Sequence, residues 1–592
     1  LILHPSSLRL LRACESSALS LQPSTMWSSL LTRLLPEPKL PPLSFPPTWH
    51  LSIDTARQQI NPVNTKPVTS VGGKYALVGE VYLRNRLELC RKIDIYNPHQ
   101  HSDLQIVVDL WEQMGPAAVP MLEGMFAFVV WETASATAWA VRDPAGGRTL
   151  YYTGTSDCWH FSPRLRELRP FHSGIIDPVA LRDYLCCAFV PGERTLWKDV
   201  LELRPGTILE LPAFCFQKYW EAKELPILTE SLDWHAARLR HKLEAVVAAC
   251  LPDQSPVGVY LSGGLDSSCI TALARKLHSD PVHTYSIHFG SETPNELEFS
   301  SAVAEHCQTR HHIIEITSDQ MWHLLPQTLA MMDDPVGDPL TIPNLILGQT
   351  ARQDVGVILN GEGGDPCFGG PKNQPMLLNQ LYKPASGHKP EAQLAAYLAS
   401  FQKCSTDLST LLLPEVWKTA SQSPSVFAND LFGSAHYLNR LLMINIKFKG
   451  ADHILTKVNN ITTALGLVGH SPLFDHRVVE MSLDIPPEFK LDGAEEKAVL
   501  KAAVADLIPK SILDRPKSGM MVPVQYWFRE KWHIRARALL MSRKARIRNY
   551  LNPQVIQQWL DYQGDVWHRY GVKLWLLVTL EIWLQVSQQT RP

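Results

Sequence analysis

A short polar segment between an apolar run and a helical pattern constrains the fold of this chain more than any other feature. The apolar residues Val257–Leu261 end at the segment SGGLDSS, residues 262–268, and a helical pattern follows over Cys269–Leu277. At a strand-to-helix turn of this kind, backbone N–H groups point outward, the helix N-terminus carries a partial positive charge, and glycine lets an anion approach the backbone. The segment therefore predicts a site for a phosphate-bearing ligand. The structural alternative is a tight turn in which Ser267 caps the helix.

The side chains of this segment extend the same prediction. The hydroxyl groups of Ser262, Ser267 and Ser268 offer further donors to a phosphate. Asp266 has the wrong charge to bind phosphate directly, but its carboxylate can hold Mg²⁺, which bridges phosphate oxygens. The segment lacks the Gly-Lys-Ser/Thr of a Walker A loop, so a P-loop NTPase is excluded.

The composition excludes several other classes of protein. The formal net charge of −2 gives no sequence-wide basic field for binding nucleic acid. The apolar stretch LWLLVTLEIWLQV near the C-terminus contains Glu581 and is too short to span a bilayer, which predicts a packed terminal helix and no membrane span. The 11 cysteines have no Cys-x-x-Cys spacing, which favours a reducing, cytoplasmic compartment with buried thiols and gives no indication of zinc.

Changes of pattern along the chain predict three parts. Residues 1–65 form an N-terminal extension with a proline-rich, extended linker, and the protein starts at either Leu1 or Met26. Residues 66–225 contain short strands rich in Val, Phe, Tyr and Trp, which predict an α+β sandwich. Residues 226–592 alternate between strands and helices and then become mostly helical, which predicts an α/β fold with a parallel sheet covered on both faces and a helical C-terminal part.

Five segments of the C-terminal part, in the same order, resemble the ATP-pyrophosphatase domain of the asparagine synthetase superfamily. They are SGGLDSS (262–268), MMDDPVGDPLTIPN (331–344), LNGEGGDPCFGG (359–370), the stretch from KVNN to EFKL (457–491) and SILDRPKSGMMVPV (511–524). Earlier segments, LVGEVY, LEGMFAFVVWE and VRDPAGGRTLYY, are similar to class II glutamine amidotransferases, which have an Ntn-type sandwich fold. The resemblance covers about residues 70–585.

The resemblance implies an adenylating, amide-forming chemistry with ATP and Mg²⁺. In such enzymes a substrate carboxylate attacks the α-phosphate of ATP, pyrophosphate leaves, and an amine then displaces AMP. By motif match, Asp266 and Asp365 bind Mg²⁺. Lys517 stabilises charge during acyl transfer, and Glu362 helps to accept the proton of the amine; the alternatives are a surface lysine and a structural turn carboxylate. The residues implied in binding pyrophosphate and adenosine are Ser262, Gly263, Gly264, Asp266, Ser267, Ser268, Tyr260, Ile287, Asn360 and Gly361.

The glutaminase-like part departs from the family's pattern. The family uses an N-terminal cysteine nucleophile, but this chain has no Met-Cys pair, and its nearest cysteine is Cys14. The Arg-Gly-Pro-Asp element is absent, and the Asn-Gly-Glu element reads Val78-Gly79-Glu80. Asp103 is left as a vestigial ligand for the amine of glutamine. We therefore expect residues 66–225 to be a scaffold without glutaminase activity.

The fourth segment of the synthetase part departs as well. Where asparagine synthetases have charged residues, this chain has Asn459, Asn460, Val468 and His470, which suggests a substrate larger and less charged than free aspartate. Residues 363–382 are similar to lasso-peptide macrolactam cyclases, which join an Asp or Glu side chain of a peptide to the N-terminal amine of the same peptide. We therefore expect a lasso-peptide cyclase with a peptide substrate, assisted by a leader-binding protein and a protease.

Other functions stay open at this point. The nearest is an asparagine synthetase, ammonia-dependent or glutamine-hydrolysing, or an enzyme similar to β-lactam synthetase. An inactive scaffold is another, although the presence of Asp266, Asp365, Glu362 and Lys517 argues against it. An enzyme that modifies nucleic acid would need cysteine pairs and a basic face, and the sequence has neither.

Overall fold

The computed structural model describes residues 48–370, 373–382, 389–492, 495–515, 521–563 and 569–589. The chain divides into two compact units, residues 1–42 and 43–592, and all described residues belong to the second. Cys14, Lys517 and the predicted proline-rich linker lie outside the described residues.

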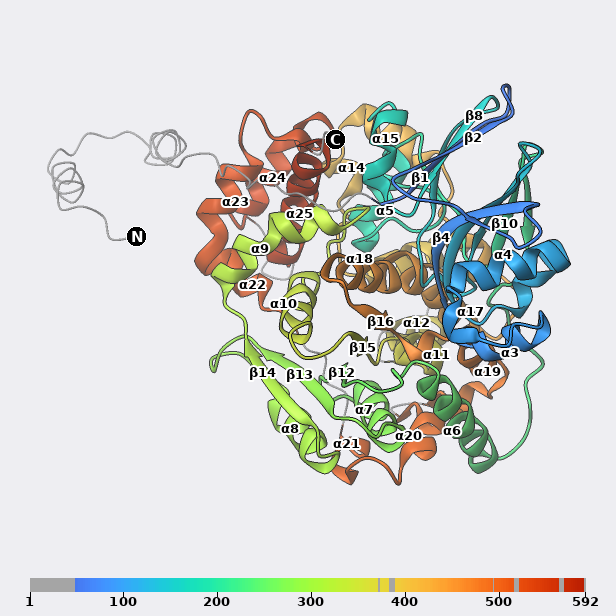
Figure 1. Cartoon of the computed structure of the whole chain (residues 1–592). Helices are drawn as coiled ribbons and strands as arrows, with labels where there is room; N and C mark the ends of the chain where they lie inside the picture. The colour runs from blue at the N-terminus through green and yellow to red at the C-terminus, as the bar shows by residue number, and fades with distance from the viewer. Residues whose placement is uncertain are drawn as a thin grey trace, which may run out of the picture. The chain divides into compact units, whose positions relative to one another are not determined.

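The N-terminal part is a sandwich of two antiparallel sheets, drawn mainly in blue in Figure 1. One sheet has the strand order β2-β1-β8-β7-β9, and the other has the order β11-β10-β6-β5-β4-β3. The strands are β1 (His50–Asp54), β2 (Gln59–Val63), β3 (Val68–Thr69), β4 (Tyr75–Leu83), β5 (Gly124–Glu132), β6 (Ala138–Arg142), β7 (Tyr151–Thr155), β8 (Cys158–Ser162), β9 (Leu201–Glu202), β10 (Thr207–Leu211) and β11 (Cys215–Lys218).

The alternating side chains of β5 explain why the two sheets pack. β5 lies between β4 and β6, and Ala127 and Val129 on one face join Leu51 and Ile53 of β1 in a single apolar cluster. The side chains on its other face pack in a second cluster together with helix α4 (Asp103–Met114). A central strand that is buried on both faces reads as a continuous apolar run, which is what MFAFVVW shows.

The sandwich begins earlier in the chain than we predicted. β1 and β2 precede residue 66, yet they form one edge of the first sheet, with Leu51 opposite Phe161 of β8. β2 is an edge strand that alternates between half-buried and exposed residues and contains Pro62. Edge strands tolerate proline and need little apolar surface, so the sequence pattern did not reveal this one.

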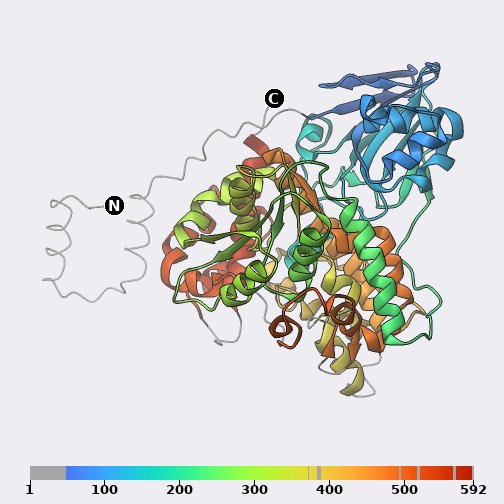
Figure 2. The same cartoon turned by 60° about the horizontal axis from the view of Figure 1, so that its bottom comes forward.

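The C-terminal part contains a parallel sheet with the strand order β14-β13-β12-β15-β16. Helices lie on both of its faces: α7 (Leu265–Leu277) and α8 (Leu297–His306) cover one face, and α10 (Thr341–Ala351) covers the other (Figures 1 and 2). This arrangement confirms the predicted α/β fold. The strands are β12 (Val257–Tyr260), β13 (Val282–His288), β14 (Arg310–Glu315), β15 (Val357–Leu359) and β16 (Val468–His470).

The direction of the strand order reverses between β12 and β15. From β12 the chain passes through α7 to β13 on one side, whereas β15 is flanked on the other side by β16. The loops that follow β12 and β15 therefore separate at the carboxyl ends of two adjacent strands, which is where open α/β sheets bind ligands. These loops carry the segments SGGLDSS and Gly-Glu-Gly-Gly-Asp.

Helices make up most of the rest. α25 (Tyr570–Gln589) contains the stretch predicted to be a packed terminal helix, and its Glu581 is buried and accepts hydrogen bonds from the N–H groups of Arg546 and Ile547 at 3.1 and 2.9 Å. The other helices are α3 (Arg86–Lys92), α5 (Pro178–Cys187), α6 (Leu232–Ala248), α9 (Ser318–Met331), α11 (Gly364–Phe368), α12 (Gln374–Tyr382), α13 (Pro390–Ser400), α14 (Leu408–Leu411), α15 (Pro414–Ser421), α16 (Ala428–Leu431), α17 (Tyr437–Ile444), α18 (Thr456–Leu465), α19 (His476–Asp484), α20 (Ala498–Val504), α21 (Lys510–Leu513), α22 (Val524–Trp527), α23 (His533–Leu540) and α24 (Pro553–Leu560).

No helix in the described ranges is both long and apolar enough to cross a membrane. The cysteines that the structure describes are free thiols, and all of them are buried except Cys158 and Cys215.

Candidate active site

The segment SGGLDSS forms the loop from β12 into the first turn of α7. Gly264 is the N-cap residue of α7, and its N–H donates to Ser262 Oγ at 3.3 Å. Ser267 Oγ lies 3.1 Å from Ser262 Oγ and accepts from the N–H of Ser262 at 3.2 Å. Gly263 has a φ of +78°, and a Cβ there would lie 2.6 Å from the backbone nitrogen of Ser300. The loop is thus held tightly by its own serines, and glycine is required at 263.

The loop after β15 packs directly on this first loop. A Cβ on Gly361 would lie 2.5 Å from the backbone nitrogen of Ser267, and one on Gly364 would lie 2.1 Å from Cγ of Asp266. Both glycines are needed because the two backbones approach closely. The family resemblance predicted Gly361 beside adenosine, whereas in the structure it lies against the backbone of the SGGLDSS loop.

Asp266 and Asp365 converge on a buried lysine that the sequence analysis did not select. Lys497 Nζ lies 2.7 and 2.6 Å from the two carboxylate oxygens of Asp266 and 2.6 Å from Oδ1 of Asp365. Burial alone would lower the pKa of Lys497, but the two carboxylates outweigh it and raise the pKa above its ordinary value. Lys497 is the N-cap residue of α20 and has a φ of +58°. This conformation costs a non-glycine residue about 1–2 kcal/mol, which the two ion pairs offset.

The chemistry of Asp266, Asp365 and Lys497 indicates whether Mg²⁺ could bind at this position. Two carboxylates from the ends of different strands meet at one cation, and oxygen ligands of this kind are what Mg²⁺ prefers. The ammonium of Lys497 stands where a cation would be shared by Asp266 and Asp365. The donor set therefore fits the predicted metal, with Asp266 and Asp365 as its protein ligands.

Three buried polar atoms that lack a partner within the described part of the chain lie at the end of β12, near the start of α7 and just after β15. They are Tyr260 Oη, Ser268 Oγ and Asn360 Nδ2. Asn360 Oδ1 accepts from the N–H of Glu362 at 3.0 Å, which holds the second loop in place. Ile287 is buried near the end of β13. Buried polar groups are usually paired, so these three atoms are consistent with a polar ligand at the position predicted for ATP.

The fifth segment contacts the SGGLDSS loop through Arg515, another residue that was not predicted from the sequence. Its guanidinium donates to the carbonyl oxygen of Gly263 at 3.1 Å, forms an ion pair with Glu296 and stacks over Phe299, with Cζ 3.9 Å from the ring centre. Arg515 is two residues before Lys517 in the motif RPKSGM. Lys517 itself lies outside the described residues, so its predicted role stays a prediction.

Glu362 lies beside a second group of charged side chains. Lys457 is buried, its Nζ is 2.7 Å from Oδ2 of Asp338, and the charge of Glu362 contributes to raising its pKa. His453 Nε2 is 3.4 Å from the same oxygen of Asp338. Burial would raise the pKa of Asp338, but Lys457 and His453 outweigh it and lower the pKa well below its ordinary range. Asp338 and Lys457 belong to the second and fourth of the five family-like segments, yet neither was predicted from the sequence.

Asn459, Asn460 and His470 of the fourth segment, which suggested a less charged substrate, contact the N-terminal sandwich. Asn459 Oδ1 accepts from Arg148 at 2.7 Å, and Asn460 Oδ1 accepts from Arg164 at 3.0 Å. His470 is fully buried, and its ring lies 4.7 Å from that of Tyr82. The side-chain carbonyl groups of both asparagines are thus paired with arginines of the sandwich. Asn459 and Asn460 therefore do not by themselves indicate a larger, less charged substrate, and that expectation stays a prediction.

Asp103, the predicted vestigial glutamine ligand, has its partners within its own domain. The carboxylate of Asp103 forms an ion pair with Arg86 and accepts from the N–H of Leu83 at 2.9 Å. Glu80, in the altered Asn-Gly-Glu element, lies 3.6 Å from Arg148 and 4.0 Å from Arg164. Both acidic groups are therefore paired with arginines in this structure.

The comparisons with known proteins agree with this geometry. The family model for asparagine synthase matches residues 238–585, and the model for a glutamine amidotransferase domain matches residues 54–220. Asparagine synthetase 1 (glutamine-hydrolyzing) of Bacillus subtilis (strain 168) is 26% identical over 546 residues, covering 87% of this chain and 85% of that protein. Asparagine synthetase 3 (glutamine-hydrolyzing) of the same organism is 26% identical over 480 residues, covering 76% of each.

A solved structure of a glutamine phosphoribosylpyrophosphate amidotransferase from B. subtilis, complexed with ADP and GMP, matches 42% of this chain and 48% of its own. Its sequence identity is 13% and its TM-score is 0.19, too low to support a conclusion. The family model, by contrast, covers more than half of the chain and both loops of the site. The chain therefore belongs to the asparagine synthase family of ATP-dependent carbon–nitrogen ligases and carries a glutamine amidotransferase-like domain on its N-terminal side.

Proposed function

We propose that this ligase uses ATP and Mg²⁺ to adenylate the side-chain carboxylate of an acidic substrate and transfers the acyl group to an amine that its own N-terminal domain does not supply. The cluster of Asp266, Asp365 and Lys497 beside the SGGLDSS loop carries the proposal. It brings two carboxylates and one ammonium together at the carboxyl ends of adjacent strands, where open α/β sheets bind ligands.

Each residue has a distinct part in this chemistry. A carboxylate oxygen of the substrate attacks the α-phosphorus of ATP, and the bond to the β-phosphate breaks as pyrophosphate leaves. Asp266 and Asp365 hold Mg²⁺, which neutralises phosphate charge when it is bound. Lys497 and the backbone N–H groups at the start of α7 stabilise the leaving pyrophosphate. The amine then attacks the acyl carbon, AMP leaves with the bonding electrons, and Glu362 accepts the proton of the amine.

The charged group next to Glu362 favours a small, charged substrate. Lys457, Asp338 and His453 lie together and are buried or nearly so, and such groups can pair with the carboxylate and ammonium of an amino acid. The curated relatives are named asparagine synthetases. We therefore favour an acidic amino acid with ammonia as the acceptor over the lasso-peptide cyclisation expected from residues 363–382.

One assay separates these substrates. Pyrophosphate release from ATP is measured with full-length protein, Mg²⁺ and ammonium chloride, with aspartate, glutamate or an acidic peptide as the carboxylate. Aspartate or glutamate should stimulate release and yield the corresponding amide by mass spectrometry. Stimulation by the peptide alone, with loss of one water from its mass, would support the cyclase instead. If none of aspartate, glutamate and the peptide stimulates pyrophosphate release, the ligase proposal is overturned for all three substrates.

The N-terminal domain is expected to have no glutaminase activity. No cysteine lies on β1, and the acidic groups left from the glutamine site are paired with arginines. Purified protein should release no glutamate from glutamine above the buffer blank, and Cys14→Ala should change neither this result nor ammonia-dependent pyrophosphate release. Glutamine hydrolysis that disappears in Cys14→Ala would restore the domain as a functional amidotransferase.

Lys517 is expected to act in acyl transfer. Loss of one preorganised charge at a reacting centre typically costs about 10²–10³-fold in rate, so Lys517→Ala should lower amide formation by that order while ATP affinity stays near that of the wild type. Lys517→Arg should restore little, because a planar guanidinium does not replace a compact ammonium. ATP affinity and amide yield are measured side by side. An alanine variant with the wild-type yield would make Lys517 a surface lysine, and one that cannot bind ATP would make it a nucleotide ligand.

A further inference from the structure

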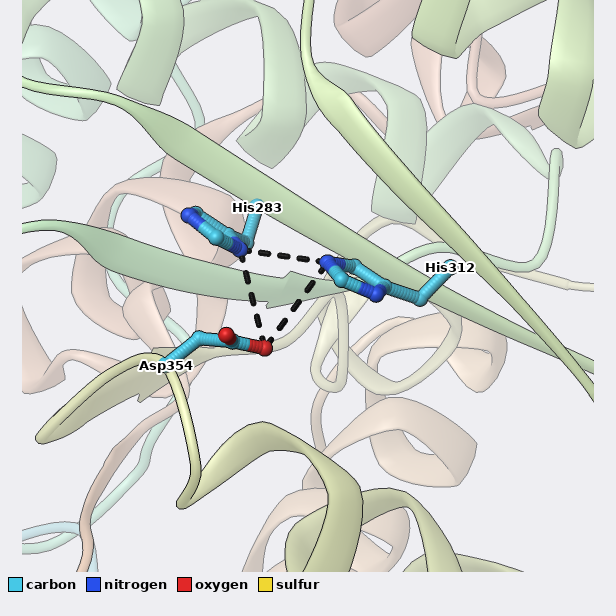
Figure 3. A group of neighbouring side chains, drawn as sticks. All are labelled: His283, His312 and Asp354. Carbon is cyan, nitrogen blue, oxygen red and sulfur yellow. Dashed lines mark hydrogen bonds and ion pairs between the residues drawn. The ribbon is translucent and has the colours of Figure 1, made fainter.

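Three side chains from distant parts of the synthetase domain meet on the α10 side of the parallel sheet. His283 is on β13, His312 is on β14, and Asp354 is in the turn between α10 and β15 (Figure 3). In the sheet register, His312 is opposite Tyr285, and Tyr285 is two residues beyond His283. Because side chains of a strand alternate between faces, His283 and His312 point to the same face.

The group lies away from the nucleotide site. Asp354 precedes β15, whereas the Gly-Glu-Gly-Gly-Asp loop follows it, so the two sites are at opposite ends of this strand. His283 is the second residue of β13 and is opposite Gly258 near the start of β12. The parts assigned above to Asp266, Asp365 and Lys497 therefore do not involve this group.

Only one of the three contacts within the group is at hydrogen-bonding distance. His283 Nδ1 is 3.1 Å from His312 Nε2, but Asp354 Oδ2 is 3.8 Å from each of these nitrogens. A separation of 3.8 Å is too long for a hydrogen bond. Ligand atoms around a tetrahedral Zn²⁺ with bonds of about 2.0–2.1 Å are about 3.3 Å apart. All three distances are within about 0.5 Å of that value.

We propose that His283, His312 and Asp354 bind one Zn²⁺ ion, with water as the fourth ligand. Imidazole nitrogen and carboxylate oxygen are ordinary zinc ligands. The side chain of His283 is 6% exposed, while those of His312 and Asp354 are both 34% exposed, so the site has a buried base and an open side for water.

Tyr285 contacts two of the proposed ligands and holds them in position. Its hydroxyl donates to Asp354 Oδ2 at 3.2 Å, and its ring stacks on that of His312 with centres 4.7 Å apart. Groups that orient metal ligands in this way typically contribute 10–100-fold to metal affinity. The ion would tie β13 and β14 to the connection between α10 and β15. The cysteine spacing could not indicate it, because no cysteine takes part.

The test uses the full chain after treatment with a chelator. Zn²⁺ binding is followed by isothermal titration calorimetry, thermal unfolding is measured with and without Zn²⁺, and Co²⁺ is used as a spectroscopic probe. The wild type should bind one equivalent, gain thermal stability with Zn²⁺ and show the visible absorption of four-coordinate Co²⁺. Asp354→Asn and His312→Gln should each bind at least about 10-fold more weakly. Asp354→Asn keeps the shape of the side chain, so it distinguishes loss of a ligand from loss of the fold.

Two control variants should bind Zn²⁺ like the wild type. His323→Gln removes an exposed histidine from α9, and Asp266→Asn removes a ligand of the proposed Mg²⁺ site. The proposal is overturned if the wild type shows no saturable binding at millimolar Zn²⁺, or if Asp354→Asn and His312→Gln bind as tightly as the wild type. A loss of binding in Asp266→Asn alone would assign the ion to the nucleotide site. None of these results depends on the proposed substrate.

Discussion

Asp266→Ala and Asp365→Ala are each expected to reduce Mg²⁺-dependent pyrophosphate release by at least about 100-fold, the lower end of the loss for one preorganised electrostatic group at a reacting centre. Both carboxylates contact the same cation, Lys497, and come from the two loops that meet at the strand ends. Without either one, the remaining carboxylate must hold the metal alone. Metal affinity is expected to fall because one charged ligand has been lost.

The measurement is pyrophosphate release as a function of Mg²⁺ concentration for wild type and both variants. Asp253→Ala is the matched control, because Asp253 is exposed and precedes β12 at the other end of the strand. The control should behave like the wild type. Wild-type release in either Asp266→Ala or Asp365→Ala would remove that residue from the metal site, whereas a variant rescued by higher Mg²⁺ would confirm weakened metal binding.

Lys497→Met is expected to lower pyrophosphate release by about 10²–10³-fold. The lysine is buried, its pKa is raised by the two aspartates, and its ammonium is the one described cation shared by both of them. Methionine keeps the length and the packing of the side chain but removes the charge that we assign to the leaving pyrophosphate. Lys497→Arg should restore part of the rate, because it retains the charge but not the compact ammonium.

Thermal unfolding separates this role from a purely structural one. Lys497→Met leaves Asp266 and Asp365 without their shared partner, so some loss of stability is expected in addition to the loss of rate. Lys501→Met is the control, since Lys501 is one turn further along α20. If Lys497→Met unfolds at a lower temperature but releases pyrophosphate at the wild-type rate below that temperature, the lysine has a structural role only.

Local sequence determined the elements that carry the nucleotide site. The loop between β12 and α7 follows from a buried apolar strand, two glycines and three serines next to a helix start, and all of these are short-range features. The packed C-terminal helix also followed from local pattern, since Glu581 interrupts its apolar stretch. Strand β2 did not, because an edge strand with Pro62 has no apolar alternation to recognise.

Tertiary structure alone decided which distant residues share a site. Lys497 is 231 residues from Asp266 in sequence, and the left-handed conformation that aims it cannot be read from neighbouring residues. The same holds for His283, His312 and Asp354, which meet only because parallel strands bring distant segments into register. Asn459 and Asn460 show the converse. From sequence their polarity suggested contact with a substrate, but in the structure their side-chain oxygens accept hydrogen bonds from Arg148 and Arg164. A residue type limits the chemistry that is available, and only the fold determines the group that it faces.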